Sequence, residues 1–186
     1  GVIFTHEHAD HTAGLDDIRP FCFRQGAMPF YAHKRVLNEL NTRFDYIFTT
    51  ENKYPGSPVV AVFEIENKPF FLGEKQIIPV DGLHNKLQVF GFRIDNFAYL
   101  TDMKTIKQEE LAKLKNLDVL VINALREASS PAHFTLNEAL EVIAKLKPKK
   151  AYLTHISHQL GFHDDVQQKL PKNVYIAYDM QQINIK

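Results

Sequence analysis

The sequence predicts an α+β fold in a single domain, residues 1–186, and two observations support this. Short β-rich runs separated by turn residues fill the middle of the chain, from Val59 to Leu100. The last third instead alternates short apolar runs with helical patterns, of which Thr135 to Leu146 is the clearest. A length of 186 residues suits one domain, and we find no internal repeat, linker or low-complexity tract that would divide it.

The first third is expected to mix short strands with short helices. Gly1 to Phe4 has the pattern of a buried strand, and a polar loop, His6 to His11, follows it. Asp10 to Ile18 is predicted to be a helix that stops before Arg19-Pro20, because the residue before a proline is biased away from helical angles. The remaining predictions are a strand at Met28–Ala32, a helix at Lys34–Leu40 and a surface excursion at Asn41–Ser57.

The middle of the chain is predicted to be a meander of strands. These strands are Val59–Ile65, Phe70–Leu72, Gln76–Val80, Leu87–Ile94 and Phe97–Leu100. Asp95-Asn96 is expected to form a tight turn, since both residues tolerate left-handed angles.

The last third is predicted to alternate helices and strands. Thr135 and Glu138 form a capping box at the start of the Thr135–Leu146 helix, and Pro148 ends that helix. The other predicted helices are Thr105–Leu114, with Thr105 as its cap, and Val166–Leu170. The predicted strands are Val119–Ile122, Ala151–Thr154 and Val174–Ala177, with Ile183–Ile185 as a continuation.

Composition excludes several classes of protein. Lys plus Arg and Asp plus Glu are both 22, a balance that disfavours a dedicated duplex-binding protein. The single cysteine, Cys22, excludes an internal disulfide framework and a cysteine-rich zinc site. No apolar stretch is long enough to span a membrane and no signal peptide is visible, so we expect a cytoplasmic protein.

Four potential metal ligands follow the first strand directly. His6-Glu7-His8-Ala9-Asp10-His11 has the pattern HxHxDH. Residues two apart in an extended segment point to the same side, so His6 and His8 are expected to bind one ion. Asp10 and His11 lie where the chain turns into a helix and are expected to face a second ion. Imidazole and carboxylate are ligands that zinc, manganese and iron accept.

Three later residues are candidates for the remaining ligands. His84, Asp102 and His155 each come near the end of a predicted strand, next to a loop. A carboxylate in such a position, as at Asp102, can bridge two ions with its two oxygens.

These motifs together resemble the metallo-β-lactamase superfamily. The resemblance rests on HxHxDH followed by Thr12-Ala13-Gly14-Leu15, then a lone histidine, then Thr-Asp and Thr-His after strands. The segment Tyr152 to Gln159 resembles the phosphodiesterase branch, which includes the phosphoribosyl 1,2-cyclic phosphate phosphodiesterases of phosphonate utilisation. The resemblance implies a four-layer αββα sandwich. Its first strands normally precede HxHxDH, so the N-terminal part of the first sheet is expected to be missing from this chain.

The resemblance also implies a site and a reaction. His6, His8 and His84 would hold one divalent ion, Asp10, His11 and His155 a second, and Asp102 would bridge them. The ions would be zinc or manganese, and a hydroxide between them would attack a small cyclic or nucleotide-like phosphodiester. Asp10 and His133 are the expected catalytic residues, with His133 acting on the leaving group.

Several alternatives stay open from the sequence. His158 is a candidate to orient a ligand or touch phosphate, or else an ordinary loop histidine, whereas His33, His163, Asp16 and Asp17 are expected to be structural or solvated. The competing functions are a tRNA 3′-processing type of endonuclease, a lactonase or thioesterase acting on a carbonyl, and an inactive metal- or nucleotide-binding module. A nucleic-acid partner is not favoured by the charge, and a homodimer is the expected assembly.

Overall fold

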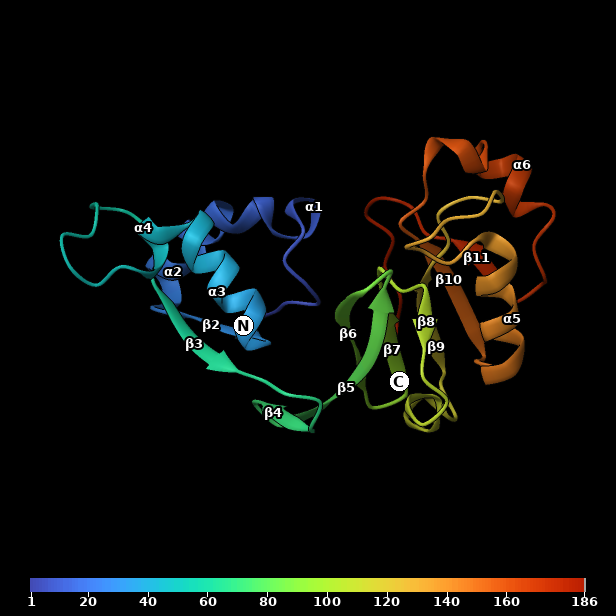
Figure 1. Ribbon diagram of the computed structural model, residues 1–186, viewed down its shortest axis with the longest axis horizontal. Helices are drawn as coiled ribbons and strands as arrows, with labels where there is room; N and C mark the ends of the chain where they lie inside the picture. The colour runs from blue at the N-terminus through green and yellow to red at the C-terminus, as the bar shows by residue number, and fades with distance from the viewer. Residues whose placement is uncertain (186) are drawn as a thin grey trace. The chain divides into compact units, whose positions relative to one another are not determined.

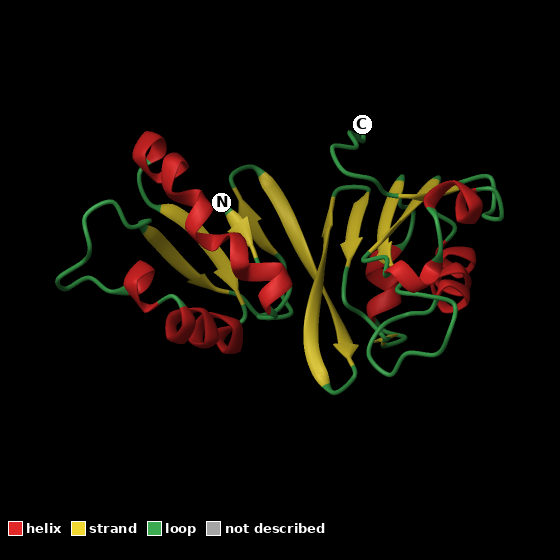
Figure 2. Ribbon diagram, turned by 90° about the horizontal axis from the view of Figure 1, so that it is seen from above, coloured by secondary structure: helices red, strands yellow, loops and turns green. Residues whose placement is uncertain are grey.

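The computed structural model describes residues 1–185 and divides into two compact units, unit 1 from Gly1 to Lys68 and unit 2 from Pro69 onward. Each unit contains its own β-sheet and its own helices (Figures 1 and 2). The predicted α+β class is confirmed. That the two units act as one domain stays a prediction.

Unit 1 is built on a parallel three-stranded sheet in the order β1-β2-β3. The strands are β1 (Val2–Ile3), β2 (Met28–Ala32) and β3 (Val60–Glu64). Alternate residues of β2, namely Met28, Phe30 and Ala32, are buried, as the period of a strand with one core-facing side requires. They share a core with residues of the 3₁₀ helix η1 (Ala13–Ile18), α2 (Arg19–Gln25), α3 (Lys34–Arg43) and α4 (Asp45–Phe48). The short helix α1 (Ala9–Thr12) precedes η1.

Two predictions for unit 1 need correction. The surface excursion expected at Asn41–Ser57 begins inside α3 and contains α4, whose Ile47 is buried in the core. The expected helix over Asp10 to Ile18 is a short α-helix followed by a 3₁₀ helix, and the chain then continues into α2 rather than stopping before Arg19-Pro20. Pro20 lies in the first turn of α2. A proline is tolerated there because its missing N–H would have no partner inside the helix. Pro20 therefore begins a new helix instead of ending the old one.

Unit 2 contains an eight-stranded mixed sheet. Its main order is β11-β10-β9-β7-β6-β5-β4, and β8 pairs with β5. The strands are β4 (Phe70–Leu72), β5 (Lys75–His84), β6 (Leu87–Ile94), β7 (Phe97–Leu100), β8 (Thr105–Ile106), β9 (Val119–Asn123), β10 (Lys150–Thr154) and β11 (Val174–Ile176). β4 to β7 are antiparallel neighbours, whereas β7, β9, β10 and β11 are parallel.

The parallel half of this sheet has a helix on one face (Figure 1). Helix α5 (Leu136–Leu146) packs Ala139 and Ile143 against alternate residues of β9, Leu120 and Ile122. The predicted capping box of Thr135 with Glu138 is present at its N-terminus. Val119 and Val121, on the opposite face of β9, belong to a separate cluster with Tyr152. None of the described helices is long and apolar enough to cross a membrane.

Four predictions for unit 2 need correction. The helix expected over Thr105 to Leu114 is replaced by β8 and a 3₁₀ helix, η2 (Glu110–Leu114), because Thr105 and Ile106 pair with β5 instead. Strand β5 does not end at Val80 but continues through Asp81-Gly82 to His84. Residues 183–185 form no strand, and the last helix, α6, spans His163–Gln167 rather than Val166–Leu170.

Candidate metal centre

Three histidine rings gather in unit 1 where β1 ends. His6 Nε2 lies 3.2 Å from His8 Nδ1, and the ring centroids of His6 and His11 are 4.3 Å apart. Asp10 Oδ2 lies 3.3 Å from His11 Nε2, and the Asp10 side chain is 64% exposed. The structure therefore brings the four predicted ligands of the HxHxDH motif together within one loop and the first turn of α1.

Glu7 fastens this loop to helix α3. Its carboxylate pairs with Arg35, and its carbonyl oxygen accepts a hydrogen bond from Arg43. Glu7 was not singled out in the sequence. The available signal was the strand period, which turns its side chain to the side opposite His6 and His8. The ion pair therefore holds the loop that carries both histidines against α3.

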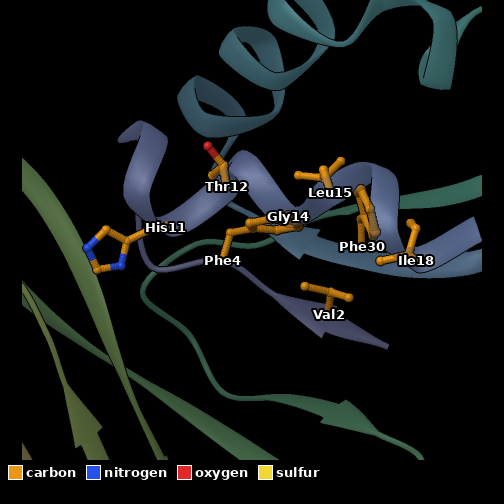
Figure 3. A pocket seen from close by; sticks show the side chains of 8 residues that line it. All are labelled: Val2, Phe4, His11, Thr12, Gly14, Leu15, Ile18 and Phe30. Atoms are coloured by element: carbon orange, nitrogen blue, oxygen red, sulfur yellow. The ribbon is translucent and has the colours of Figure 1, made fainter. Parts of the chain in front are cut away.

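An apolar cavity of about 250 Å³ lies beside the same loop. Most of the lining side chains are apolar, and His11 lies at one edge of the group (Figure 3). The lining is Val2, Phe4, His11, Thr12, Gly14, Leu15, Ile18 and Phe30. One candidate ligand thus adjoins space suited to an apolar group.

The predicted ligands of unit 2 meet at one edge of its sheet. β5 and β7 are both antiparallel to β6, and β7 is parallel to β9 and β10, so these four strands end at the same edge. His84 is the last residue of β5, Asp102 lies two residues after β7, and His155 directly follows β10. The topology explains how residues distant in sequence come together.

Asp102 is at the centre of this second cluster. Its Oδ2 lies 3.3 Å from the Nε2 atoms of both His133 and His155, and its side chain is only 2% exposed. The rings of His133 and His155 stack with centroids 4.9 Å apart. The ring of His84 meets that of His133 edge-on at 4.5 Å. His133, predicted for proton transfer, therefore also lies among the candidate ligands.

Hydrogen bonds and burial determine the protonation of these histidines. His84 Nδ1 lies 2.8 Å from the carbonyl oxygen of Ala132, so this nitrogen donates and Nε2 is left with its lone pair. Burial lowers the pKa of His133, and the neighbouring His84 and His155 lower it further. The negative charge of Asp102 raises this pKa, but the net shift is downward. A neutral imidazole is the form that can bind a metal or accept a proton.

His155 has an unusual backbone. Its φ is +55°, in the left-handed region that non-glycine residues rarely adopt. Such a conformation costs free energy and persists only where surrounding contacts impose it. His155 directly follows the last residue of β10, and its ring contacts Asp102.

A buried amide holds the segment that carries Asp102. The Asn123 side chain, fully buried at the end of β9, accepts a hydrogen bond from Met103 N and donates one to Met103 O, at 2.8 and 3.0 Å. Gly82 leaves room for the Met103 side chain, since a Cβ at position 82 would lie 2.7 Å from its sulfur. Sequence reasoning missed Asn123, although a polar residue ending a wholly buried strand was a usable signal.

The remaining predicted residues lie outside the two clusters. His158 begins a 3₁₀ turn with an exposed side chain, and among the described residues no hydrogen bond or ion pair links it to Asp102. His33 has a structural role, as expected, because its Nδ1 accepts a hydrogen bond from Arg35 N and caps α3. Asp16 pairs with Arg19, and His163 pairs with Asp164 at the surface.

The donor atoms of unit 2 suit a transition-metal ion. One donor atom each from His84, Asp102 and His133 lies within 4.8 Å of the others. Two imidazoles and a carboxylate are ligands of zinc and manganese. The second ring nitrogen of His84 is already engaged by a carbonyl, an arrangement that is usual for metal-binding histidines.

Comparisons of the sequence with known proteins find one family and one relative. A family model described as the beta-lactamase superfamily domain matches residues 1–156. An octanoyltransferase of Porphyromonas gingivalis is 35% identical over 180 residues, which are 96% of this chain and 36% of that protein. The chain thus spans about a third of the length of this relative.

Comparisons of the structure with solved structures agree with the family match. A diphosphatase of the PhnP family is similar with a TM-score of 0.89 and 33% identity, over 99% of this chain and 70% of that one. YhfI of Bacillus subtilis, a metallo-β-lactamase fold protein, has a TM-score of 0.73 and 19% identity, over 95% and 73%. The short form of human tRNase Z has a TM-score of 0.70 and 17% identity, over 99% of this chain and 78% of that one. The last two establish likeness of fold alone.

Proposed function

Because the chain belongs to the metallo-β-lactamase superfamily, we propose that it is a metal-dependent hydrolase acting on a small phosphodiester, cyclic or nucleotide-like. The observation that carries this proposal is the contact of His133 Nε2 with Asp102 Oδ2 among candidate metal ligands. An imidazole beside a metal-binding carboxylate can protonate a departing alkoxide. A phosphodiester with a poor leaving group needs such a group.

The proposed ligands come from both clusters. We assign His6, His8 and His84 to one ion, Asp10, His11 and His155 to a second, and Asp102 to both. When bound, zinc or manganese ions would activate water and neutralise negative charge on the phosphoryl oxygens.

Two side chains are proposed to move protons or orient water. His133 would pass a proton from its imidazolium form to the leaving oxygen and be left as the neutral imidazole that its lowered pKa favours. Asp10 is more exposed than Asp102, and its carboxylate would accept a hydrogen bond from the attacking water. The Asp102 oxygen near His133 would fix the direction of Nε2.

A second candidate is hydrolysis of an acyl ester or thioester. Two observations favour it: the relative described as an octanoyltransferase, and the apolar cavity with His11 at its edge. A cavity of about 250 Å³ could take a short acyl chain. With a thioester the departing thiolate is less basic than an alkoxide, so His133 would matter less.

The deciding experiment combines metal analysis with two substrates. The purified chain is assayed for zinc and manganese by elemental analysis, and then for hydrolysis of bis-p-nitrophenyl phosphate and of an octanoyl thioester. We expect two ions per chain and faster turnover of the diester. Turnover of the thioester alone would replace the first proposal by the second, and two bound ions without turnover of either would indicate a binding module.

A further inference from the structure

Strand β3 forms an edge of the unit 1 sheet, since among the described strands it pairs with β2 alone. Val59, just before β3, accepts a hydrogen bond from β2 at 2.8 Å, and Ile65, just after it, donates one to β2 at 3.0 Å. Backbone groups alternate in direction along a strand, so the odd-numbered residues of β3 are the ones that face β2. The N–H and C=O groups of the even-numbered residues therefore point away from the sheet, and these residues are Val60, Val62 and Glu64.

This edge lacks the features that usually prevent strands from pairing. Edge strands in natural proteins are commonly protected by lysine, proline or a bulge. The sequence of β3, Val-Ala-Val-Phe-Glu, contains neither lysine nor proline, and its register with β2 is continuous. The side chains of Val62 and Phe63 are each 46% exposed. β3 is therefore an apolar edge that another extended strand can join.

The sequence of β3 is complementary to a second copy of itself. In an antiparallel pair centred on Val62, this residue faces its own counterpart, and Val60 faces Glu64 of the second copy. Only this two-fold register pairs all three outward-facing residues with residues of β3. It also places Phe63 opposite Ala61, so that a large side chain meets a small one.

We propose that two copies of the chain associate by antiparallel pairing of their β3 strands, centred on Val62. A centre shifted by one residue toward the N-terminus would set Glu64 opposite Pro58, which has no N–H to donate. The 22 basic and 22 acidic residues balance, so net charge does not drive two copies apart. The contact is the same on both copies, as a two-fold homodimer requires.

The first test measures association of the full chain by sedimentation equilibrium. The wild-type chain should dimerise as its concentration rises. Val62→Lys sets two like charges opposite each other, so it should raise the dissociation constant of the dimer at least about tenfold. Val62→Glu should have the same effect, whereas an equimolar mixture of the two variants should dimerise again, because unlike charges then meet.

The control for this test is Phe23→Lys. It makes a similar change at a side chain of α2 that is 70% exposed, and it should leave the association unchanged. A monomeric wild-type chain, equal weakening by both lysine variants, or no recovery in the mixture would overturn the proposal.

The second test determines the register by disulfide formation. Cys22 is buried, so a cysteine placed on the outer edge of β3 supplies the reactive thiol. In the proposed pair the Cα atoms of the two Val62 residues would be about 5.5 Å apart, within the range of a disulfide. Those of the two Glu64 residues would be about 14 Å apart, four residues along the strand. Under oxidation Val62→Cys should form a covalent dimer and Glu64→Cys should not. Crosslinking of Glu64→Cys, alone or to the same extent as Val62→Cys, would overturn the proposed pairing.

Discussion

The two histidine clusters are built in opposite ways. The cluster of unit 1 comes from six consecutive residues of a loop and one helical turn, and its Asp10 is largely exposed. The cluster of unit 2 comes from four residues between positions 84 and 155, and its Asp102 is almost wholly buried. The first needs only a short piece of chain to bring ligands together. The second needs the sheet order, its register and a buried amide, so its function and its stability are coupled.

Removing Asp102 is expected to have the largest effect. Asp102→Ala takes away the carboxylate that contacts His133 and His155 and is the proposed bridge. We expect loss of bound metal and a fall in kcat/KM of at least a thousandfold, or about 4 kcal/mol of transition-state stabilisation. Elemental analysis and the diester assay measure the two effects. Retention of two ions per chain would show that Asp102 is not a shared ligand.

His133→Gln should separate proton transfer from metal binding. We expect unchanged metal content and a rate lower by about 10²- to 10⁴-fold on diesters with basic leaving groups, but a much smaller loss with p-nitrophenol as the leaving group. The comparison requires kcat for a series of aryl and alkyl esters. If metal content falls instead, His133 is a ligand, as its position within 4.8 Å of donors from His84 and Asp102 also allows.

Asn123→Ala should show how far the second cluster depends on the core. The substitution leaves the buried N–H of Met103 without its acceptor and opens a small cavity. We expect a loss of about 2–3 kcal/mol in the free energy of unfolding, measured by urea denaturation. The control is Asn137→Ala, at an exposed position of α5, which should change the value by less than about 0.5 kcal/mol. Equal effects of the two substitutions would remove Asn123 from the support of Asp102.

The sequence was most informative where the evidence was local. The strands Met28–Ala32 and Leu87–Ile94 match the predictions exactly, and so does the capping box of Thr135 with Glu138. These features depend on neighbours in the chain. By contrast, Thr105 carried a local helix signal, and the structure pairs it with Leu83 in a strand. Pairing with a distant strand outweighed a weak local preference.

The difference between local and distant contacts also decides which parts of the candidate site the sequence predicted. The HxHxDH motif was visible because its ligands are adjacent in sequence, and the ligands of unit 2 were found from their places near strand ends and from the resemblance. Glu7 and Asn123 were missed. Each acquires its role from a partner 20 or more residues away, respectively Arg35 and Met103. No local sequence pattern identifies such partners.

The smallest expected effect concerns the loop of unit 1. Glu7→Gln keeps the shape of the side chain but removes its charge, so the ion pair with Arg35 is lost while the histidines remain. Loss of a partner that orients metal ligands typically weakens metal affinity by 10- to 100-fold. Because this ion pair acts only through the backbone, we expect metal binding to be about tenfold weaker. Competition with a chelator measures the affinity. Glu66→Gln, which breaks the exposed pair with Lys68 in unit 1, is the control and should leave metal affinity unchanged. A matching loss in both variants would mean that the total charge of unit 1, and not the contact made by Glu7, sets the affinity. A loss confined to Glu7→Gln would show that even the local cluster depends on a contact from outside the motif.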